Sequence, residues 1–320
     1  MKNIFRGAVL AAALLPLTAA TDKGYRYILT GNPEDAKASP KGGFILEGGA
    51  DDPEEAMRWM IKRSGGGDFL VLRASDEDDM HNMVPELGKV DSVETFIFDS
   101  TVPAHDPFVI GKIDQADAIF FAGGDQSEYV RFWKNTPVQD AVNRAIKRGV
   151  PVGGISAGLA ILGQFQFEAM GEYVTPERAL KDPYGPGITL GRDFLEIPPL
   201  RGIITDTHFS QRGRLARLLV FMARLVQDGW TSDAKGIGVD EETAVIVEAD
   251  GAARVTGKNE AVFVRLSQKP RICRPGEPLT AEGFEVVNVT PGHKFNIKKW
   301  KGSGRASRVD VVDGVLKPAH

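Results

Sequence analysis

Residues 150–163 read Val-Pro-Val-Gly-Gly-Ile-Ser-Ala-Gly-Leu-Ala-Ile-Leu-Gly, which predicts a short buried strand, a tight turn and an apolar helix. Ser156 stands in the turn, with one glycine two residues before it and another two residues after it. This is the pattern of a nucleophile elbow, in which small neighbours let a strand and a helix approach closely around a strained serine. We therefore expect Ser156 to expose its hydroxyl group at the carboxyl end of a strand. The alternative is a tightly packed connection with an inert serine.

The segments around this turn alternate short apolar runs with Gly-rich turns and stretches of helical periodicity, beginning at about residue 40. Strands are predicted at 44–46, 69–72, 95–98, 118–121, 150–152 and 202–205. Such alternation is typical of parallel strands joined by crossover helices. After about residue 236, hairpin signals such as Asp250-Gly251 and Asp313-Gly314 replace it. The predicted fold is α/β: a mostly parallel central sheet with helices on both faces and antiparallel additions at its C-terminal edge.

The composition is that of a globular protein, because 42% of the 320 residues are hydrophobic and 26% are charged. No low-complexity linker divides the chain. We therefore expect one α/β core over residues 21–265, with a β-rich extension over 266–320 packed on it. The single cysteine, Cys273, excludes an intrachain disulfide and a Cys-rich zinc site. Neither a Walker motif nor a full dinucleotide fingerprint is present, so we expect no cofactor and no metal.

The first twenty residues have the layout of a secretory signal. Lys2 and Arg6 precede an apolar run over 8–17, and small residues follow it at 18–20. The run is too short for a membrane span of about 20 residues, so we expect export to the periplasm or the medium and removal of the segment. A buried N-terminal helix is the alternative. Removal would change the formal net charge from −4 to −6, which argues against nonspecific nucleic-acid binding.

A serine nucleophile needs a base, and His208 is the histidine best placed for that role. The four others lie in loops, in hairpins or at the end of the chain: His81, His105, His293 and His320. His208 follows the predicted strand at 202–205 and precedes a helix with an apolar stripe. It should therefore stand at the same edge of the sheet as Ser156.

The carboxylate that would orient His208 cannot be chosen by spacing, because residues 240–242 are all acids: Asp240, Glu241 and Glu242. Asp206 lies two residues before His208, on the same face of an extended strand, and is a further candidate for binding or orientation. Backbone N–H groups of Ala157 and of the Gly123-Gly124 turn could stabilise an oxyanion, with Gln126 near the substrate.

Three arginines crowd the start of the helix that follows His208: Arg212, Arg214 and Arg217. Their charge has the wrong sign for the N-terminal end of a helix dipole. We expect anionic groups to offset it, either carboxylates of the chain itself or a carboxylate-bearing ligand held by guanidinium groups.

Four blocks of sequence together resemble the cyanophycinases and, more distantly, the wider serine peptidase family S51 that includes aspartyl dipeptidases. The blocks are Gly-Gly-Asp-Gln at 123–126, Gly-Ile-Ser-Ala-Gly at 154–158, Asp-Thr-His-Phe-Ser-Gln-Arg-Gly-Arg-Leu at 206–215 and Gly-Ile-Gly-Val-Asp-Glu at 236–241. The resemblance spans about residues 40–265. It implies a class I glutamine-amidotransferase-like fold that often dimerises, and a triad of Ser156, His208 and Glu241. It also implies that the substrate contacts are Gln126, Asp206, Arg212, Arg214 and Arg217.

The resemblance further implies an exported serine hydrolase that cleaves aspartyl peptide bonds and releases β-Asp-Arg dipeptides from cyanophycin. This polymer has a polyaspartate backbone with arginine on each side-chain carboxylate. Backbone N–H groups of Gly124 and Ala157 would form the oxyanion hole. The alternatives are an aspartyl or isoaspartyl dipeptidase, an esterase, and a noncatalytic periplasmic peptide-binding protein. An esterase of the α/β-hydrolase fold has the chain order Ser, acid, His, which differs from the order here.

Overall fold

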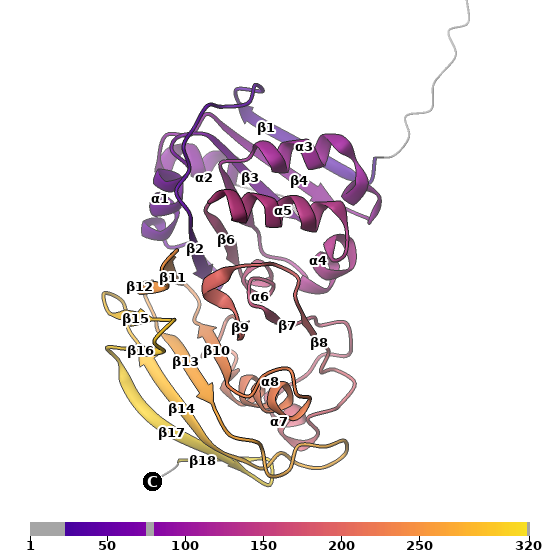
Figure 1. Ribbon diagram of the computed structural model, residues 1–320, viewed down its shortest axis with the longest axis vertical. Coiled ribbons are helices and arrows are strands. Elements are labelled where there is room, and N and C mark those ends of the chain that lie inside the picture. Colours follow the sequence, from indigo (N-terminus) through magenta and orange to yellow (C-terminus); the bar gives the residue numbers. More distant parts are fainter. Residues whose placement is uncertain (1–22, 75–79, 319–320) are drawn as a thin grey trace, which may run out of the picture.

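Two β-sheets, each covered by helices, make up the protein (Figure 1), whose computed structural model describes residues 23–74 and 80–318. The predicted secretory segment at 1–20 lies outside the described residues. Among the residues that are described, no helix is long and apolar enough to cross a membrane.

The first sheet has ten strands, of which the five from β4 to β2 are parallel. In spatial order they are β1 (Tyr25–Gly31), β4 (Ser92–Phe98), β3 (Asp68–Arg73), β5 (Ala118–Phe121), β6 (Val152–Ile155), β2 (Gly43–Glu47), β11 (Thr243–Glu248), β12 (Ala252–Gly257), β15 (Lys294–Asn296) and β16 (Lys301–Gly302). Strand β1 pairs antiparallel with β4, and every pairing from β2 to β16 is antiparallel.

The second sheet has eight strands and is mainly antiparallel. Its order is β18 (Val315–Pro318), β17 (Arg305–Val312), β14 (Ala281–Val289), β13 (Ala261–Leu266), β10 (Ala234–Val239), β9 (Ile203–Asp206), β7 (Phe165–Phe167) and β8 (Leu190–Arg192). Only the pairs β10–β9 and β9–β7 are parallel.

The expectation of one mostly parallel sheet is therefore wrong. The predicted strand at 202–205 exists as β9, but it pairs with β10 in the second sheet rather than with β6 in the first. The C-terminal residues contribute to both sheets, since β14, β17 and β18 extend the second while β15 and β16 extend the first. A short apolar run indicates a strand but does not specify its partner, because the same residues can be buried in either sheet.

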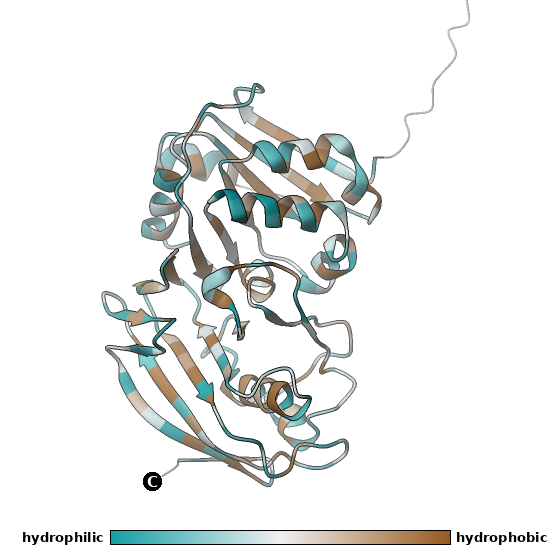
Figure 2. Ribbon diagram, viewed as in Figure 1, coloured by the Kyte–Doolittle hydropathy of each residue, from teal (hydrophilic) through white to brown (hydrophobic). Residues whose placement is uncertain are grey.

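Helices cover both faces of the first sheet. Helices α1 (Glu54–Arg63) and α2 (Met80–Leu87) pack against one face, and α3 (Pro107–Gln115) and α5 (Pro137–Arg148) against the other. Three other elements are short: α7 (Pro176–Lys181), η1 (Val102–His105) and η2 (Pro198–Leu200). Figure 2 shows apolar strands behind helices with polar outer faces. Such alternation of buried and solvent-facing sides follows from the residue periodicities of strands and helices.

The second sheet is covered by α8 (Leu215–Gln227), whose apolar stripe the sequence predicts.

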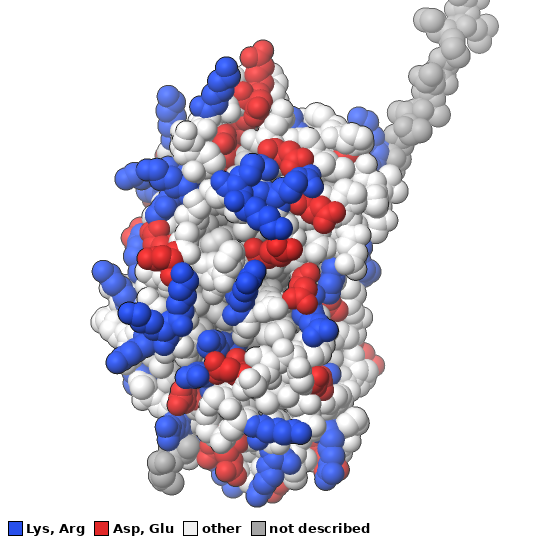
Figure 3. Space-filling model, in the orientation of Figure 1, with Lys and Arg blue, Asp and Glu red and all other residues white. Residues whose placement is uncertain are grey.

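The surface carries charges of both signs. Figure 3 shows basic and acidic groups interspersed on the face that carries α3 and α5, and Arg144 is ion-paired with Asp114 at 2.8 Å.

The predicted elbow forms at Ser156, between the end of β6 at Ile155 and the start of α6 (Ala157–Ala160). Glycine is required at positions 154 and 158, because a Cβ atom at either position would collide with backbone. A Cβ atom on Gly158 would lie 2.0 Å from the carbonyl oxygen of Phe121 in β5, and one on Gly154 would lie 2.6 Å from the carbonyl carbon of Gly158. Strand and helix therefore approach more closely than any larger residue permits.

We predict that Gly158→Ala lowers the free energy of unfolding by about 2–3 kcal/mol, because the added methyl group must displace backbone. Urea unfolding followed by circular dichroism measures this. Gly111→Ala is the control, since nothing lies within 4 Å of a Cβ atom at that position in α3. Alanine there should be neutral or stabilising by up to ~1 kcal/mol. Equal unfolding midpoints for the two variants would contradict the packing argument.

Candidate active site

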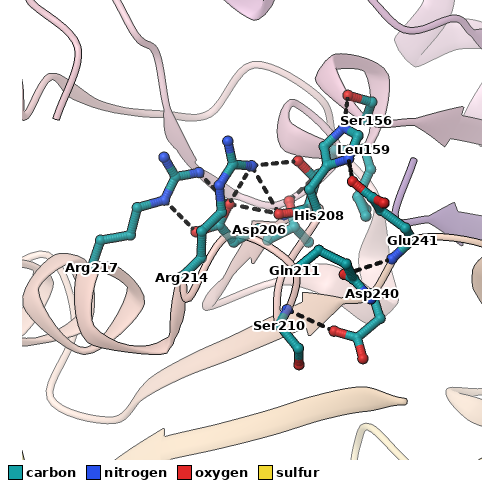
Figure 4. Close-up of polar contacts among 12 residues, drawn as sticks. Ser156, Leu159, Asp206, His208, Ser210, Gln211, Arg214, Arg217, Asp240 and Glu241 are labelled. Carbon is teal, nitrogen blue, oxygen red and sulfur yellow. Dashed lines mark hydrogen bonds and ion pairs between the residues drawn. The ribbon is translucent and has the colours of Figure 1, made fainter. Parts of the chain in front are cut away.

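Ser156, His208 and Glu241 form a hydrogen-bonded line (Figure 4). The Oγ atom of Ser156 lies 2.8 Å from Nε2 of His208, and Nδ1 of His208 lies 2.7 Å from Oε1 of Glu241. The His208 side chain is 12% exposed and that of Glu241 is 30% exposed. This is the arrangement of a nucleophile, a base and a carboxylate that orients the base.

The line joins the two sheets. Ser156 follows β6 of the first sheet, whereas His208 and Glu241 follow β9 and β10, which are parallel neighbours in the second. Because parallel strands end at a common edge, the residues after β9 and β10 emerge side by side. The hydroxyl group of Thr205 in β9 donates to the carbonyl oxygen of Leu159 in α6 at 2.8 Å, which fixes the two sheets at this junction.

The backbone at the junction is held in conformations that are rare for side-chain-bearing residues. Ser156 has φ of 52° and His208 has φ of 43°. Gly49, with φ of 125°, packs against the imidazole of His208, where a Cβ atom would lie 2.2 Å from Cε1. Only glycine fits there, so the ring of His208 is held in place by close contact with the backbone.

The three consecutive acids have separate partners. Only Glu241 contacts His208. Asp240 accepts the backbone N–H of Ser210 at 2.8 Å, and Glu242 is paired with Lys258. The geometry therefore distinguishes three residues that the sequence left equivalent.

Gln211 is a site residue that sequence reasoning missed. Its Oε1 accepts the backbone N–H of Glu241 at 3.0 Å, which helps to fix the position of that carboxylate (Figure 4). The only available signal was its place three residues after His208.

A cleft of about 580 Å³ opens beside the serine. Its lining includes Ser156, His208 and Gly123. A Cβ atom on Gly123 would lie 3.7 Å from Cβ of Ser156, so the Gly123-Gly124 turn lies next to the nucleophile. Gln126 begins α4 (Gln126–Trp133) just after this turn, and buried Ala157 begins α6. Over the residues that the structure describes, no group of three or more His, Cys, Asp or Glu could hold a metal ion.

Asp206, Arg214 and Arg217 form a buried charge network behind His208. Nε and one terminal nitrogen of Arg217 donate to the carboxylate of Asp206 at 2.8 and 2.5 Å, and Arg214 lies 3.6 Å from the same carboxylate. Arg214 also donates to the carbonyl oxygen of Thr207 at 2.8 Å, one residue before His208. Two of the three crowded arginines are thus offset by a carboxylate of the chain itself, whereas Arg212 is exposed.

Comparison with known proteins gives a consistent result. The sequence model of peptidase family S51 matches residues 87–175. The chain is 29% identical over 237 residues to a cyanophycinase of Synechococcus elongatus, covering 70% of this chain and 68% of that protein. It is 26% identical over 273 residues to a cyanophycinase of Trichormus variabilis, covering 80% and 86%. The chain is a peptidase similar to those of family S51 and to the cyanophycinases.

The fold of this peptidase is also similar to a solved structure. A peptidase from an acI-B1 Actinobacterium superposes with a TM-score of 0.56, at 16% sequence identity, over 80% of this chain and 97% of that one. The matched stretch of the family model contains Ser156 but ends before His208 and Glu241.

Electrostatics keep His208 of the peptidase in its basic form. Burial lowers the pKa of His208 from its ordinary value, its hydrogen bond to Glu241 opposes this, and the nearby charges of Arg212 and Arg214 lower it further. Burial also lowers the pKa of Arg214 to about 10. Near neutral pH the imidazole is therefore neutral and able to accept a proton from Ser156.

We predict that kcat/KM rises with pH through a midpoint below about 6.5, the ordinary pKa of histidine, because only neutral His208 can act as base. Arg212→Gln removes a positive charge that disfavours the imidazolium, so the midpoint should move to higher pH. Rates measured from pH 4 to 8 test this, with Arg308→Gln on β17 as the control. A midpoint that stays in place or falls in Arg212→Gln would refute the charge effect.

We also predict that Asp206→Asn lowers the free energy of unfolding by about 3 kcal/mol, because it leaves the buried charge of Arg217 without its carboxylate. The control is Asp233→Asn, which breaks a half-exposed pair with Arg265 and should cost no more than ~1 kcal/mol. Urea unfolding measures both, and similar losses would show that the Asp206 pair is not effectively buried.

Proposed function

We propose that the chain is a serine peptidase that cleaves aspartyl peptide bonds of cyanophycin and releases β-Asp-Arg dipeptides. The observation that carries this proposal is the hydrogen-bonded line from Glu241 through His208 to Ser156, which ends at an open cleft. The similarity to proteins named cyanophycinase supports the choice of substrate.

In the first step, Oγ of Ser156 attacks the carbonyl carbon of the scissile bond while Nε2 of His208 takes its proton. Glu241 accepts the N–H of Nδ1, which selects the tautomer with a free Nε2 and stabilises the imidazolium as it forms. The distance of 2.8 Å suits the proton transfer from Ser156 to His208, and that of 2.7 Å suits the orienting hydrogen bond to Glu241, without rearrangement of the side chains.

In the second step, the imidazolium gives its proton to the leaving amine, and water then hydrolyses the acyl ester by the same route in reverse. Negative charge develops on the carbonyl oxygen in both halves of the reaction. The backbone N–H of Ala157, at the start of α6, and that of Gly124, in the turn beside Ser156, are the proposed donors to it.

Substrate contacts would come from groups that remain accessible. Arg212 is exposed near the base and can meet a substrate carboxylate, and Gln126 lies after the turn that borders the cleft. Asp206 and Arg217 are paired with each other behind His208, so we propose that they act through its position. Export is part of the proposal and is supported by the layout of residues 1–20.

Replacement of the nucleophile tests the proposal. Ser156→Ala should lower kcat for release of β-Asp-Arg from cyanophycin by about 10⁴-fold or more, since removal of one member disables the whole triad. Mass spectrometry of the products measures this, and Ser210→Ala, which alters an exposed serine near His208, is the control.

A serine-directed fluorophosphonate probe adds a second measurement. It should label Ser156 in the unaltered protein and lose most labelling in His208→Ala, because the base activates the serine. Full activity of Ser156→Ala would refute the triad. Absence of both labelling and turnover in the unaltered protein would instead favour a noncatalytic binding protein.

A further inference from the structure

A buried phenol lies beneath the turn that borders the nucleophile. Tyr129, on α4, has a side chain that is 0% exposed. Its hydroxyl group lies 2.9 Å from the carbonyl oxygen of Ala122 and 2.7 Å from that of Gly123, the two residues that follow β5. Burial raises the pKa of Tyr129 above its ordinary value, so the phenol keeps its proton and donates to these oxygens. The turn is thus held from its buried side by a side chain of α4.

The ring of Tyr129 is fixed by packing. It stacks on Trp133 with ring centroids 4.6 Å apart and an angle of 15° between the ring planes. Trp133 in turn packs against Phe98 and Phe121 of the core. Phenylalanine would keep this packing, whereas a hydroxyl group is costly to bury unless it finds a partner. What distinguishes tyrosine from phenylalanine at this position is therefore its contact with the two carbonyl groups.

The carbonyl group of Gly123 belongs to the same peptide unit as the N–H group of Gly124. The peptide bond is trans, so the two groups point in opposite directions. Because the carbonyl group points toward buried Tyr129, the N–H group points away from it. Among the residues that the structure describes, no group accepts the N–H of Gly124. Gly123 lines the cleft beside Ser156, so this donor is available next to the nucleophile.

The same peptide lies between two glycines, and neither has a Cβ atom to oppose its rotation. Such a unit can turn over by changes in ψ of the first residue and φ of the second, at a low steric cost. Gly124 already has φ of 142°. In the reversed orientation the N–H group would face Tyr129, and the carbonyl oxygen of Gly123 would face the opposite way and repel an oxyanion. The orientation of this peptide therefore decides whether the turn can stabilise negative charge.

We propose that Tyr129 is a positioning residue of the oxyanion hole. Its hydroxyl group holds the carbonyl oxygen of Gly123 on the buried side and so presents the N–H of Gly124 to the carbonyl oxygen of the substrate. Preorganised donors stabilise an oxyanion because they need no reorientation as the charge develops. Buried Tyr129 acts through this peptide rather than on the substrate. This inference rests on the proposed function, because the oxyanion arises in the reaction of Ser156.

Tyr129→Phe removes the hydroxyl group and keeps the ring. We expect kcat for release of β-Asp-Arg to fall by about 10- to 100-fold, less than for loss of a whole oxyanion donor, because the peptide still samples the productive orientation. KM and the pH midpoint of kcat/KM should not change, because the oxyanion forms only after binding and His208 is unaltered. Tyr25→Phe removes a hydroxyl group that lies 3.2 Å from Asp106, and as the control it should retain kcat. An unchanged kcat in Tyr129→Phe, or a change confined to KM, overturns the proposal.

A variant with a similar loss of stability separates positioning from a merely structural role. Val142→Ala opens a cavity in the same core cluster and leaves the hydroxyl group of Tyr129 in place. Urea unfolding gives the stability of both variants, and both are assayed at a temperature at which they are folded. Val142→Ala should retain kcat even if it is the less stable variant. An equal fall in kcat in the two variants would attribute the effect to stability and overturn the proposal.

The rate of fluorophosphonate labelling separates this inference from the proposed function. Oγ of Ser156 forms a bond to phosphorus, fluoride leaves, His208 takes the serine proton, and the phosphoryl oxygen occupies the oxyanion hole. Labelling of Tyr129→Phe should be slower than that of the unaltered protein by about tenfold or more, which supports the proposal even if cyanophycin is not cleaved. Equal labelling rates overturn it even if cyanophycin is cleaved. Absence of both labelling and turnover in the unaltered protein overturns this inference together with the proposed function.

Discussion

The hydrogen bond between Ser156 and His208 spans the junction of two sheets, and the site depends on how firmly that junction is fixed. A nucleophile on β6 and a base after β9 could separate by small shifts of one sheet against the other. Three contacts prevent this: the bond from Thr205 to Leu159, and the two backbone bonds from Ser156 and His208 to residues 47 and 48. All three are short-range and directional, so they fix the positions of both side chains. Precise positioning is what triad chemistry requires.

The charges around His208 follow from the same constraint. The helix α8 begins with arginines that its own dipole disfavours, and Asp206, at the end of β9, pairs with two of them. A buried ion pair contributes little net stability but is costly to break, so it restricts the backbone to one arrangement. Here the restricted backbone is the one that carries the imidazole. The network is therefore better explained by positioning than by a stabilising role in the fold.

The sequence predicts the local structure of this protein well and its long-range pairing poorly. The elbow at 154–158, the strands at 44–46 and 118–121 and the hairpin at 250–251 depend on neighbouring residues, and the structure has each of them. Which sheet a strand joins depends on partners that are distant in the sequence. The residues of an apolar strand such as 202–205 do not indicate which strand will pair with it. For the same reason, the sequence could propose that Ser156 and His208 meet at an edge, but not that two sheets supply this edge.

Long-range contacts of charged side chains are the least visible in sequence. In the sequence, Asp51 and Asp52 indicate only the polar start of a helix, because Pro53 follows them. Glu47 is a single charged residue at the end of an apolar run. Only the fold buries Glu47 beside Asp52, which lines the cleft that Ser156 shares. Burial and the charges of Arg212 and Arg214 lower the pKa of His208, which also lines this cleft. A base in this position is neutral near neutral pH and can accept a proton, which the proposed reaction requires.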